Sequence, residues 1–151
     1  MPQSLAQIYL HIVFSTKKRK PFLKNNSMRE KLYAYMAGIC KNLECPAIII
    51  GGVENHVHLL TRFSRKIPVR DFIKELKRSS SKWIKDKWPE ISAFAWQAGY
   101  GTFSISPSHV AGVQKYIANQ AEHHRKESFE DEFRRLCQKY NIQIDERYVW
   151  D

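Results

Sequence analysis

The sequence lacks several features that would each point to a particular class of protein. It has no run of about 18 consecutive apolar residues, so we expect no membrane-spanning helix. Positive charge follows the short apolar segment near the N-terminus, whereas a secretory signal has the reverse order, and this predicts a cytoplasmic protein. No P-loop or G-x-G-x-x-G motif occurs, so a nucleotide cofactor is not expected.

Cysteine is scarce as well, and low-complexity segments, internal repeats and Gly/Ser-rich linkers are absent. Cys40, Cys45 and Cys137 form no C-x-x-C pair, and they suit a reducing compartment better than a disulfide framework. Because nothing in the composition marks a boundary, residues 1–151 are expected to form a single domain.

What the sequence has in excess is positive charge. Lys and Arg number 25 against 15 Asp and Glu, which gives a net charge of +10. An excess of this size favours a polyanionic partner, of which nucleic acid is the commonest, although a basic surface without a specific partner has the same composition. The hydrophobic share of 43% and the aromatic share of 13% are typical of a folded chain.

The hydrophobic pattern predicts an α+β fold. Alternating and β-branched segments predict strands, and apolar residues at helical spacing predict helices between and after them. The strands are expected at 7–15, 46–52, 57–63 and within 93–104; the helices are expected from a capping box at Ser27–Glu30, from Pro68 to just before Pro89, over 107–125, and over 129–140 with Ser128 as the cap. The order is that of the ferredoxin-like or RRM-like split β-α-β fold, an antiparallel sheet with helices on one face. The other face is left for a site and for additional C-terminal helices.

His56-Val57-His58 begins the third predicted strand. Alternate side chains of a strand point to the same face, so His56 and His58 emerge together while Val57 and Leu59 enter the core. Two imidazoles on a rigid strand form half of a metal site. An H-x-H pair by itself is a weak signal, because such pairs are common on exposed strands.

Tyr116 and Gln120 lie four residues apart in the third predicted helix and therefore share one of its faces. With His123 they flank an apolar stripe instead of lying within it. These three polar side chains could line a cavity, but an amphipathic helix with a half-exposed tyrosine has the same pattern.

Together these residues indicate phosphodiester chemistry. A phenol with a pKa of about 10 is a poor nucleophile unless a metal withdraws charge from the phosphate and positions it in line. Two histidines and one glutamine would leave three positions of an octahedral ion open for phosphate and water. The imidazoles favour manganese over magnesium, with zinc and nickel as alternatives. Tyr100 is a rival nucleophile, and His11 is interpreted as a core histidine near the pair.

These segments resemble one family over residues 5–151. HVHLL after IIIGGVEN, then QAGYGTFSIS, VQKYIANQAEHH, SFEDEF and DERYVWD, are similar to the HUH single-tyrosine transposases of the insertion sequence 200/605 group. The resemblance implies a transposase of single-stranded DNA that forms a 5′-phosphotyrosine intermediate. It implies Tyr116 as the nucleophile, and His56, His58 and Gln120 as ligands of magnesium or manganese.

The resemblance also implies partners. Members of the family act as homodimers in which the tyrosine helix can dock on the partner chain, and Gly99, Gly101 or Gly112 would be its pivot. They recognise DNA hairpins at the ends of the element. For that contact we expect two basic groups, one in the loop after the first strand and one on the second helix: Lys17, Lys18, Arg19 and Lys20, and Lys74, Lys77 and Arg78.

Two other functions fit the same sequence. A non-catalytic RRM-like nucleic-acid-binding module would explain the fold and the charge, but it would leave the histidine pair and Tyr116 incidental. A domesticated HUH nickase of repeated hairpins would keep the chemistry without moving its own gene.

Overall fold

The structure is a computed structural model, and it describes residues 2–151. Its strands form one antiparallel sheet in the order β2-β3-β1-β4: β1 (Tyr9–Ser15), β2 (Ala47–Val53), β3 (His56–Arg62) and β4 (Gly101–Ile105). The helices are α1 (Asn26–Asn42), α2 (Val69–Lys87), α3 (Val110–Ala118), α4 (Gln120–His123) and α5 (Phe129–Lys139). Short 3-10 turns are η1 (Lys17–Arg19), η2 (Pro89–Ile91) and η3 (Pro107–His109). Across residues 2–151, no helix is both long and apolar enough to cross a bilayer.

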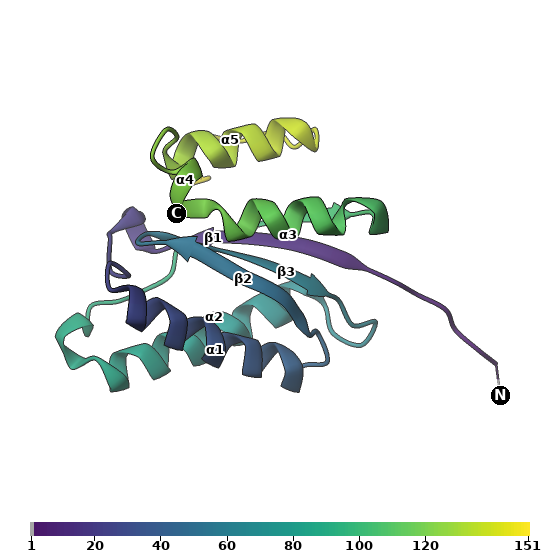
Figure 1. Ribbon diagram of the computed structural model, residues 1–151, viewed down its shortest axis with the longest axis horizontal. Coiled ribbons are helices and arrows are strands. Elements are labelled where there is room, and N and C mark those ends of the chain that lie inside the picture. Colours follow the sequence, from purple (N-terminus) through teal and green to yellow (C-terminus); the bar gives the residue numbers. More distant parts are fainter. Residues whose placement is uncertain (1) are drawn as a thin grey trace.

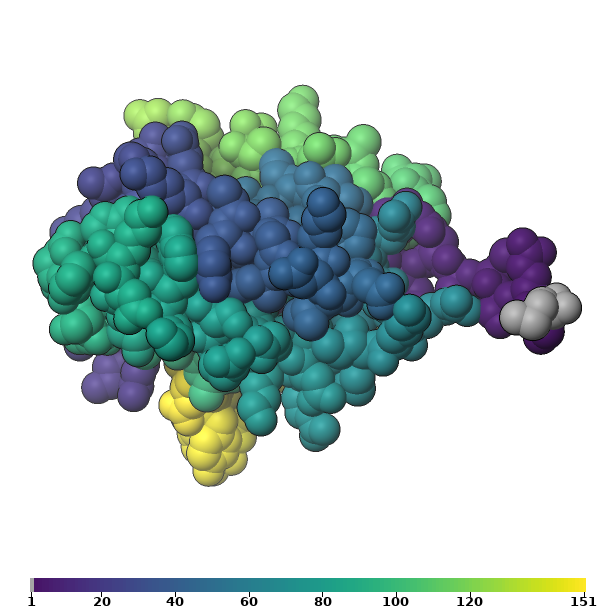
Figure 2. All heavy atoms as spheres, turned by 90° about the horizontal axis from the view of Figure 1, so that it is seen from below, coloured from purple at the N-terminus to yellow at the C-terminus, as the bar shows by residue number. Residues whose placement is uncertain are grey.

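The sheet separates two layers of helices (Figure 1). α1 and α2 cover one face, where they pack on a large apolar core that includes Ile12 and Phe14 of β1 and Val57 and Leu59 of β3. Figure 2 looks onto this layer and shows α1 and α2 side by side over the sheet. α3, α4 and α5 lie over the opposite face. The predicted α+β class, the antiparallel sheet and the division into two faces are therefore confirmed.

The ends of α2 and α5 agree with the sequence signals, whereas the start of α1 does not. Ser128 caps α5, since its side chain accepts a hydrogen bond from the backbone N–H of Asp131. The cap of α1 is Asn25, whose Oδ1 accepts from the N–H of Met28 at 3.0 Å. The capping box expected at Ser27 is therefore wrong, because an amide oxygen two residues earlier already takes that role.

The helix predicted over 107–125 is also wrong as one continuous element. The chain leaves helical geometry at Asn119, at φ −102° and ψ 23°, and its N–H contacts the carbonyls of both Lys115 and Tyr116. Tyr116 consequently belongs to α3, whereas Gln120 is the first residue of α4. The break lets both side chains point at the sheet, and Gln120 is buried.

One glycine sets how closely α3 approaches the sheet. A Cβ on Gly51 of β2 would lie 2.8 Å from the backbone oxygen of Ile117, a distance that real Cβ contacts do not reach. The absence of a side chain there allows α3 to rest directly on β2. Since Ile117 follows Tyr116, Gly51 also fixes the height of Tyr116 above the sheet.

Candidate active site

The alternation of β3 places two histidines beneath the helices. His56 and His58 face α3–α5, whereas Val57 and Leu59 enter the opposite core, as the strand pattern predicts. Both imidazoles are fully buried, because α4 and α5 cover them. His11 of β1 lies beside the pair, and its Nε2 is 2.8 Å from Nδ1 of His58. It is buried, as expected of a core histidine, but it contacts the polar cluster directly.

A buried carboxylate occupies the centre of this cluster. Oε1 of Glu132, from α5, lies 3.0 Å from Nε2 of His58, 3.4 Å from Nε2 of His56 and 3.0 Å from Nε2 of His124. Its Oε2 accepts hydrogen bonds from Nε2 of Gln120 at 3.2 Å and from the phenol of Tyr116. One glutamate therefore joins the side chains of β3, α3, α4 and the turn after it.

Hydrogen bonding orients the imidazole of His56 toward the cluster. Its Nδ1 lies 2.7 Å from Oδ1 of Asn55. An amide oxygen can only accept, so Nδ1 donates to it, and Nε2 is the ring atom that faces the centre of the cluster. That Nε2 is 3.1 Å from Oε1 of Gln120, which is another acceptor. Two acceptors that face one another in this way suit a cation between them.

The spacing of the donor atoms fits a metal ion. One ligand atom from each of His56, His58, His124 and Glu132 lies within 4.8 Å of all the others. Two ligands bound at about 2.1 Å to an octahedral or tetrahedral ion are about 3.0 to 3.4 Å apart. The contacts of Glu132 and of Gln120 with these imidazoles fall in that interval. The cluster can therefore hold a metal, and its identity is not fixed by this geometry.

The protonation of these groups follows from burial and charge. Burial, with the charge of His58 next, lowers the pKa of His11 to about 3. Burial likewise lowers the pKa of His58 to about 4, against the opposing effect of Glu132. Burial opposes ionisation of Glu132, but hydrogen bonds from the surrounding histidines hold its pKa far below the ordinary range. The centre thus carries one ionised carboxylate beside the neutral imidazoles of His11 and His58, a charge distribution that attracts a cation.

Tyr116 is a protonated phenol in this arrangement. Burial, then the charge and the hydrogen bond of Glu132, raise its pKa above the ordinary value, although Arg135 opposes the shift. Nη2 of Arg135 donates to the phenol oxygen at 2.9 Å, and its other donors bind Glu127. The phenol oxygen thus lies between a carboxylate that accepts its hydrogen bond and a guanidinium that can stabilise its anion.

Sequence reasoning missed Glu132, His124 and Arg135. For Glu132 a signal existed, since it occupies the second position of the apolar stripe Phe129, Glu132, Phe133 and Leu136 on α5. A charged residue within an otherwise apolar stripe of a helix indicates a special environment. His124 carried no such signal, because it follows a break that the sequence pattern did not reveal.

The basic residues expected to bind DNA fall into two places. η1 holds Lys17, Lys18 and Arg19, and it adjoins the β2–β3 turn beside His56, since the N–H of Thr16 bonds the carbonyl of Asn55. Lys17 and Lys18 are exposed, as is the following Lys20, whereas the guanidinium of Arg19 donates to the carbonyl of Trp150 at 2.7 Å.

The second group lies on α2, in the layer opposite the histidine pair (Figure 1). Lys77 binds the carbonyls of Gln97 and Gly99 at 2.8 and 2.7 Å, so its charge is used inside the fold. Arg78 pairs with Glu75, and Lys74 is exposed. Tyr100, the rival nucleophile, lines a separate cavity with Phe133 and Tyr148.

Comparisons with known proteins agree with this architecture. The family model described as "Transposase IS200 like" matches residues 4–120. The ISDra2 transposase TnpA of Deinococcus radiodurans is 25% identical over 119 residues, which are 76% of this chain and 84% of that protein. A crystal structure of a candidate transposase from the same organism superposes with a TM-score of 0.65 at 21% identity, over 80% of this chain and 95% of the other. The REP-associated tyrosine transposase bound to a REP hairpin gives a TM-score of 0.59 at 11% identity, over 82% and 73% of the chains.

Proposed function

The chain belongs to the IS200-like transposase family, and from that premise we propose that it nicks and rejoins single-stranded DNA with Tyr116 as its nucleophile. The observation that supports this most directly is the convergence on Glu132 of the Tyr116 phenol, the His56–His58 pair and Gln120. A nucleophile, a proton acceptor and metal donors thus meet at one buried point.

The proposed reaction moves one proton and exchanges one phosphoester bond. The phenol of Tyr116 gives its proton to Oε2 of Glu132, and its oxygen attacks the scissile phosphorus. The bond to the 3′-oxygen breaks, and Glu132 returns the same proton through water to that oxygen, so the strand leaves with a 3′-hydroxyl. The 5′-phosphate remains on Tyr116. A different 3′-hydroxyl reverses the sequence and joins a new strand, so no external energy source is required.

Residues of this chain would stabilise the two negative charges of that step, one on the tyrosine oxygen and one on the phosphate. Arg135 would stabilise the tyrosine oxygen as it loses its proton. His56, His58 and Gln120 would hold magnesium or manganese, with Glu132 and His124 as further donors, and such an ion supplies electrostatic stabilisation of the phosphate. The carboxylate and amide oxygens strengthen the case for magnesium or manganese over zinc, because hard cations prefer oxygen ligands.

We further propose that one chain suffices for cleavage. The resemblance predicts a homodimer with shared sites, yet here Tyr116 and Gln120 contact the cluster of their own chain. Mixing Tyr116→Phe with His58→Ala protein tests this. Sites made within one chain leave the mixture inactive, whereas sites shared between two chains restore a measurable fraction of activity. The homodimer itself stays a prediction.

For the DNA we propose a single strand that carries a hairpin, bound in part by the exposed lysines around η1. Lys17, Lys18 and Lys20 lie at the same end of the sheet as His56, so a duplex stem held there would place its flanking strand near Tyr116. Removal of each phosphate contact should weaken binding and reduce the salt slope by about 0.7 to 0.9.

The decisive experiment is a covalent-adduct assay. The protein is incubated with Mn²⁺ and labelled hairpin-bearing single strands from the flanks of its own gene, and adducts are resolved on a denaturing gel. Wild type should form an adduct, and Tyr116→Phe should bind the same DNA without forming one. Tight binding without any adduct in the wild type would favour the non-catalytic module. An adduct that persists in Tyr116→Phe would transfer the role to another tyrosine.

A further inference from the structure

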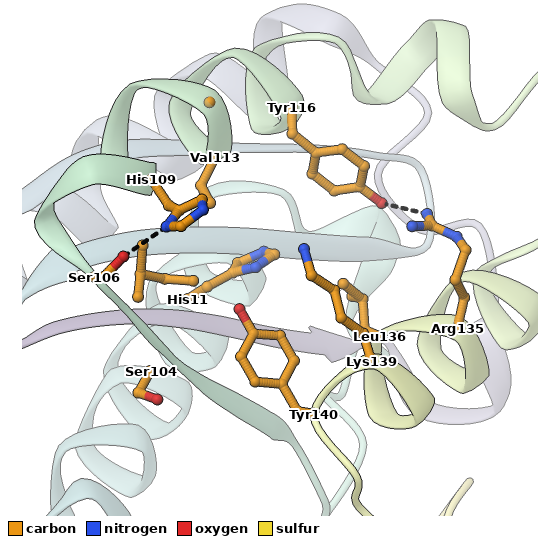
Figure 3. A pocket seen from close by; sticks show the side chains of 12 residues that line it. His11, Ser104, Ser106, His109, Val113, Tyr116, Arg135, Leu136, Lys139 and Tyr140 are labelled. Atoms are coloured by element: carbon orange, nitrogen blue, oxygen red, sulfur yellow. Dashed lines mark hydrogen bonds between the residues drawn. The ribbon is translucent and has the colours of Figure 1, made fainter.

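A cavity of about 600 Å³ opens beside Tyr116, and His11, which contacts His58 of the metal cluster, forms part of its wall. It lies between β1 and β4 below, α3 on one side and α5 on the other (Figure 3). Resting on the function proposed above, we propose that this cavity binds the nucleoside that stays attached to Tyr116 through its 5′-phosphate. This nucleoside site is additional to the metal cluster and to the His56–His58 pair described above.

The charge around the cavity suits a phosphodiester strand. Its lining includes Lys139 and Arg135, the latter already paired with Glu127, and it contains no aspartate or glutamate. Figure 3 shows the ammonium of Lys139 pointing into the cavity. Lys139 takes part in none of the ion pairs formed within residues 2–151, so its charge is available to a ligand. A cationic rim next to a nucleophilic tyrosine favours a nucleotide over an uncharged ligand.

The side chains that line the cavity suit a nucleobase, which is a flat ring with apolar faces and polar edges. Ile105, Val113 and Leu136 supply aliphatic surface, and the ring of Tyr140 faces the interior. Tyr140 is held in place because it stacks on Phe103, with ring centroids 4.9 Å apart. A volume of this size lies within the range of small-ligand sites. Aromatic surface beside positive charge is the combination with which proteins bind single-stranded nucleic acid, since every base has a π-face.

The geometry of displacement selects which nucleoside enters. In an in-line attack, the tyrosine oxygen and the departing 3′-oxygen lie on opposite sides of the phosphorus. The departing nucleoside therefore lies on the far side of the phosphorus from Tyr116. The nucleoside joined through its 5′-oxygen lies beside the line that runs from the tyrosine oxygen through the phosphorus to the 3′-oxygen. Because Tyr116 itself forms one wall of the cavity, the retained nucleoside is the neighbour that can reach it.

Gly112 offers a way to fill the cavity without disturbing the fold. It lines the cavity from α3, and a Cβ added there meets no atom within 4 Å. Gly112→Leu should narrow the cavity and also favour the helix, because glycine is a poor helix former. Gly38 is the matched control: it lies in α1, in the other helical layer, and a Cβ there is equally free of contacts. Gly38→Leu should leave ligand binding unchanged.

The first test uses mononucleotides and needs no cleavage. Binding of deoxyadenosine 5′-monophosphate and 3′-monophosphate is measured by calorimetry on wild type, Gly112→Leu, Lys139→Gln and Gly38→Leu. We expect wild type and Gly38→Leu to prefer the 5′-monophosphate, and Gly112→Leu and Lys139→Gln to bind it at least about 10-fold more weakly. Equal affinity in all four proteins, or equal affinity for the two isomers, would overturn the assignment.

The second test uses a strand whose cleavage position has been mapped from the adduct. An abasic residue is placed directly 3′ or directly 5′ of the scissile phosphate, and binding is measured on Tyr116→Phe protein. The 3′ abasic residue should weaken binding about 5- to 100-fold, the range expected from one stacked base, and Gly112→Leu should remove that difference. Equal effects of the two abasic positions would refute the inference. Failure of the wild type to form any adduct would instead refute the proposed function, while the mononucleotide result would stand.

Discussion

The two faces of the sheet are built from the same strands but bury different chemistry. Toward α1 and α2, β1 and β3 contribute Ile12, Phe14, Val57 and Leu59 to an apolar core. Toward α3–α5, β3 contributes His56 and His58, and the apolar contacts form two smaller clusters on either side of them. One face can be stabilised by close packing alone, whereas the other must hold a buried charge.

The difference shows how a small protein carries a buried polar site. A buried carboxylate is unfavourable unless hydrogen bonds or opposite charges compensate it. Here Glu132 receives that compensation from hydrogen bonds of His58, His124, Gln120 and Tyr116, and the larger core on the far face supplies stability that does not depend on the site. Changes on the two faces should therefore have separable effects.

The largest effect should come from Glu132→Gln. The amide keeps the shape of the side chain but removes the negative charge and the proton acceptor. We expect the rate of adduct formation to fall about 100- to 10,000-fold, the contribution typical of a positioned base, and the affinity for Mn²⁺ to fall at least about 10-fold. Mn²⁺ affinity can be followed by the electron paramagnetic resonance signal of the free ion. Glu130→Gln, on the same helix, is the control, and unchanged Mn²⁺ affinity in Glu132→Gln would show that its carboxylate is not a ligand.

Phe72→Ala tests the opposite face. Phe72 of α2 is fully buried in the apolar core, and truncation of such a side chain costs about 3 to 5 kcal/mol. Urea unfolding should show that loss, while the protein that remains folded keeps the Mn²⁺ affinity of wild type. A matching loss of metal affinity would mean that the two faces are not separable.

Gly51→Ala should have a smaller effect, confined to the site. The added Cβ would meet the backbone of Ile117, so α3 must move outward and carry Tyr116 with it. Misplacement by a fraction of an ångström reduces the rate, and we expect adduct formation about 10- to 100-fold slower with Mn²⁺ affinity nearly unchanged. Gly38→Ala provides the comparison. If the Gly51→Ala protein nicks DNA at the wild-type rate, the close contact between α3 and β2 does not position the nucleophile.

The last test of the comparison concerns acid. His11 and His58 have pKa values of about 3 and 4 in the folded protein and about 6.5 when unfolded, so the unfolded state binds more protons between those values. The free energy of unfolding of the metal-free protein should therefore decrease as the pH falls from about 6.5 toward 4. Glu132, whose folded pKa is depressed, adds to the loss below about pH 4.5, whereas His124, whose pKa is raised, opposes it. Urea unfolding in the presence of EDTA from pH 7 to 4.5 measures the slope, and a flat profile would contradict the buried neutral histidines.

Periodicity was sufficient to predict most of the fold. The alternation of β1 and β3 reports which side chains share a face, and this predicted the positions of His56, His58 and Val57 correctly. It did not predict the break at Asn119, because Tyr116 and Gln120 keep helical spacing across it. A local pattern cannot reveal a change of direction that tertiary contacts impose.

The candidate site was predictable only in part for a related reason. His56 and His58 are two residues apart, so their proximity follows from the strand. Glu132 is 74 residues from His58 in sequence, and their contact depends on how α5 folds back over the sheet. The sequence-based ligand set was made of neutral groups, whereas the assembled cluster contains a carboxylate, which changes the charge that an ion would experience.

His11 belongs to two environments at once. One nitrogen touches His58, while the ring forms part of the wall of the cavity beside Tyr116. Two binding events that share a side chain are coupled, and the coupling is reciprocal: the factor by which a cation alters the affinity for a nucleotide must equal the factor by which the nucleotide alters the affinity for the cation. Through His11, occupancy of either site would therefore change the affinity of the other.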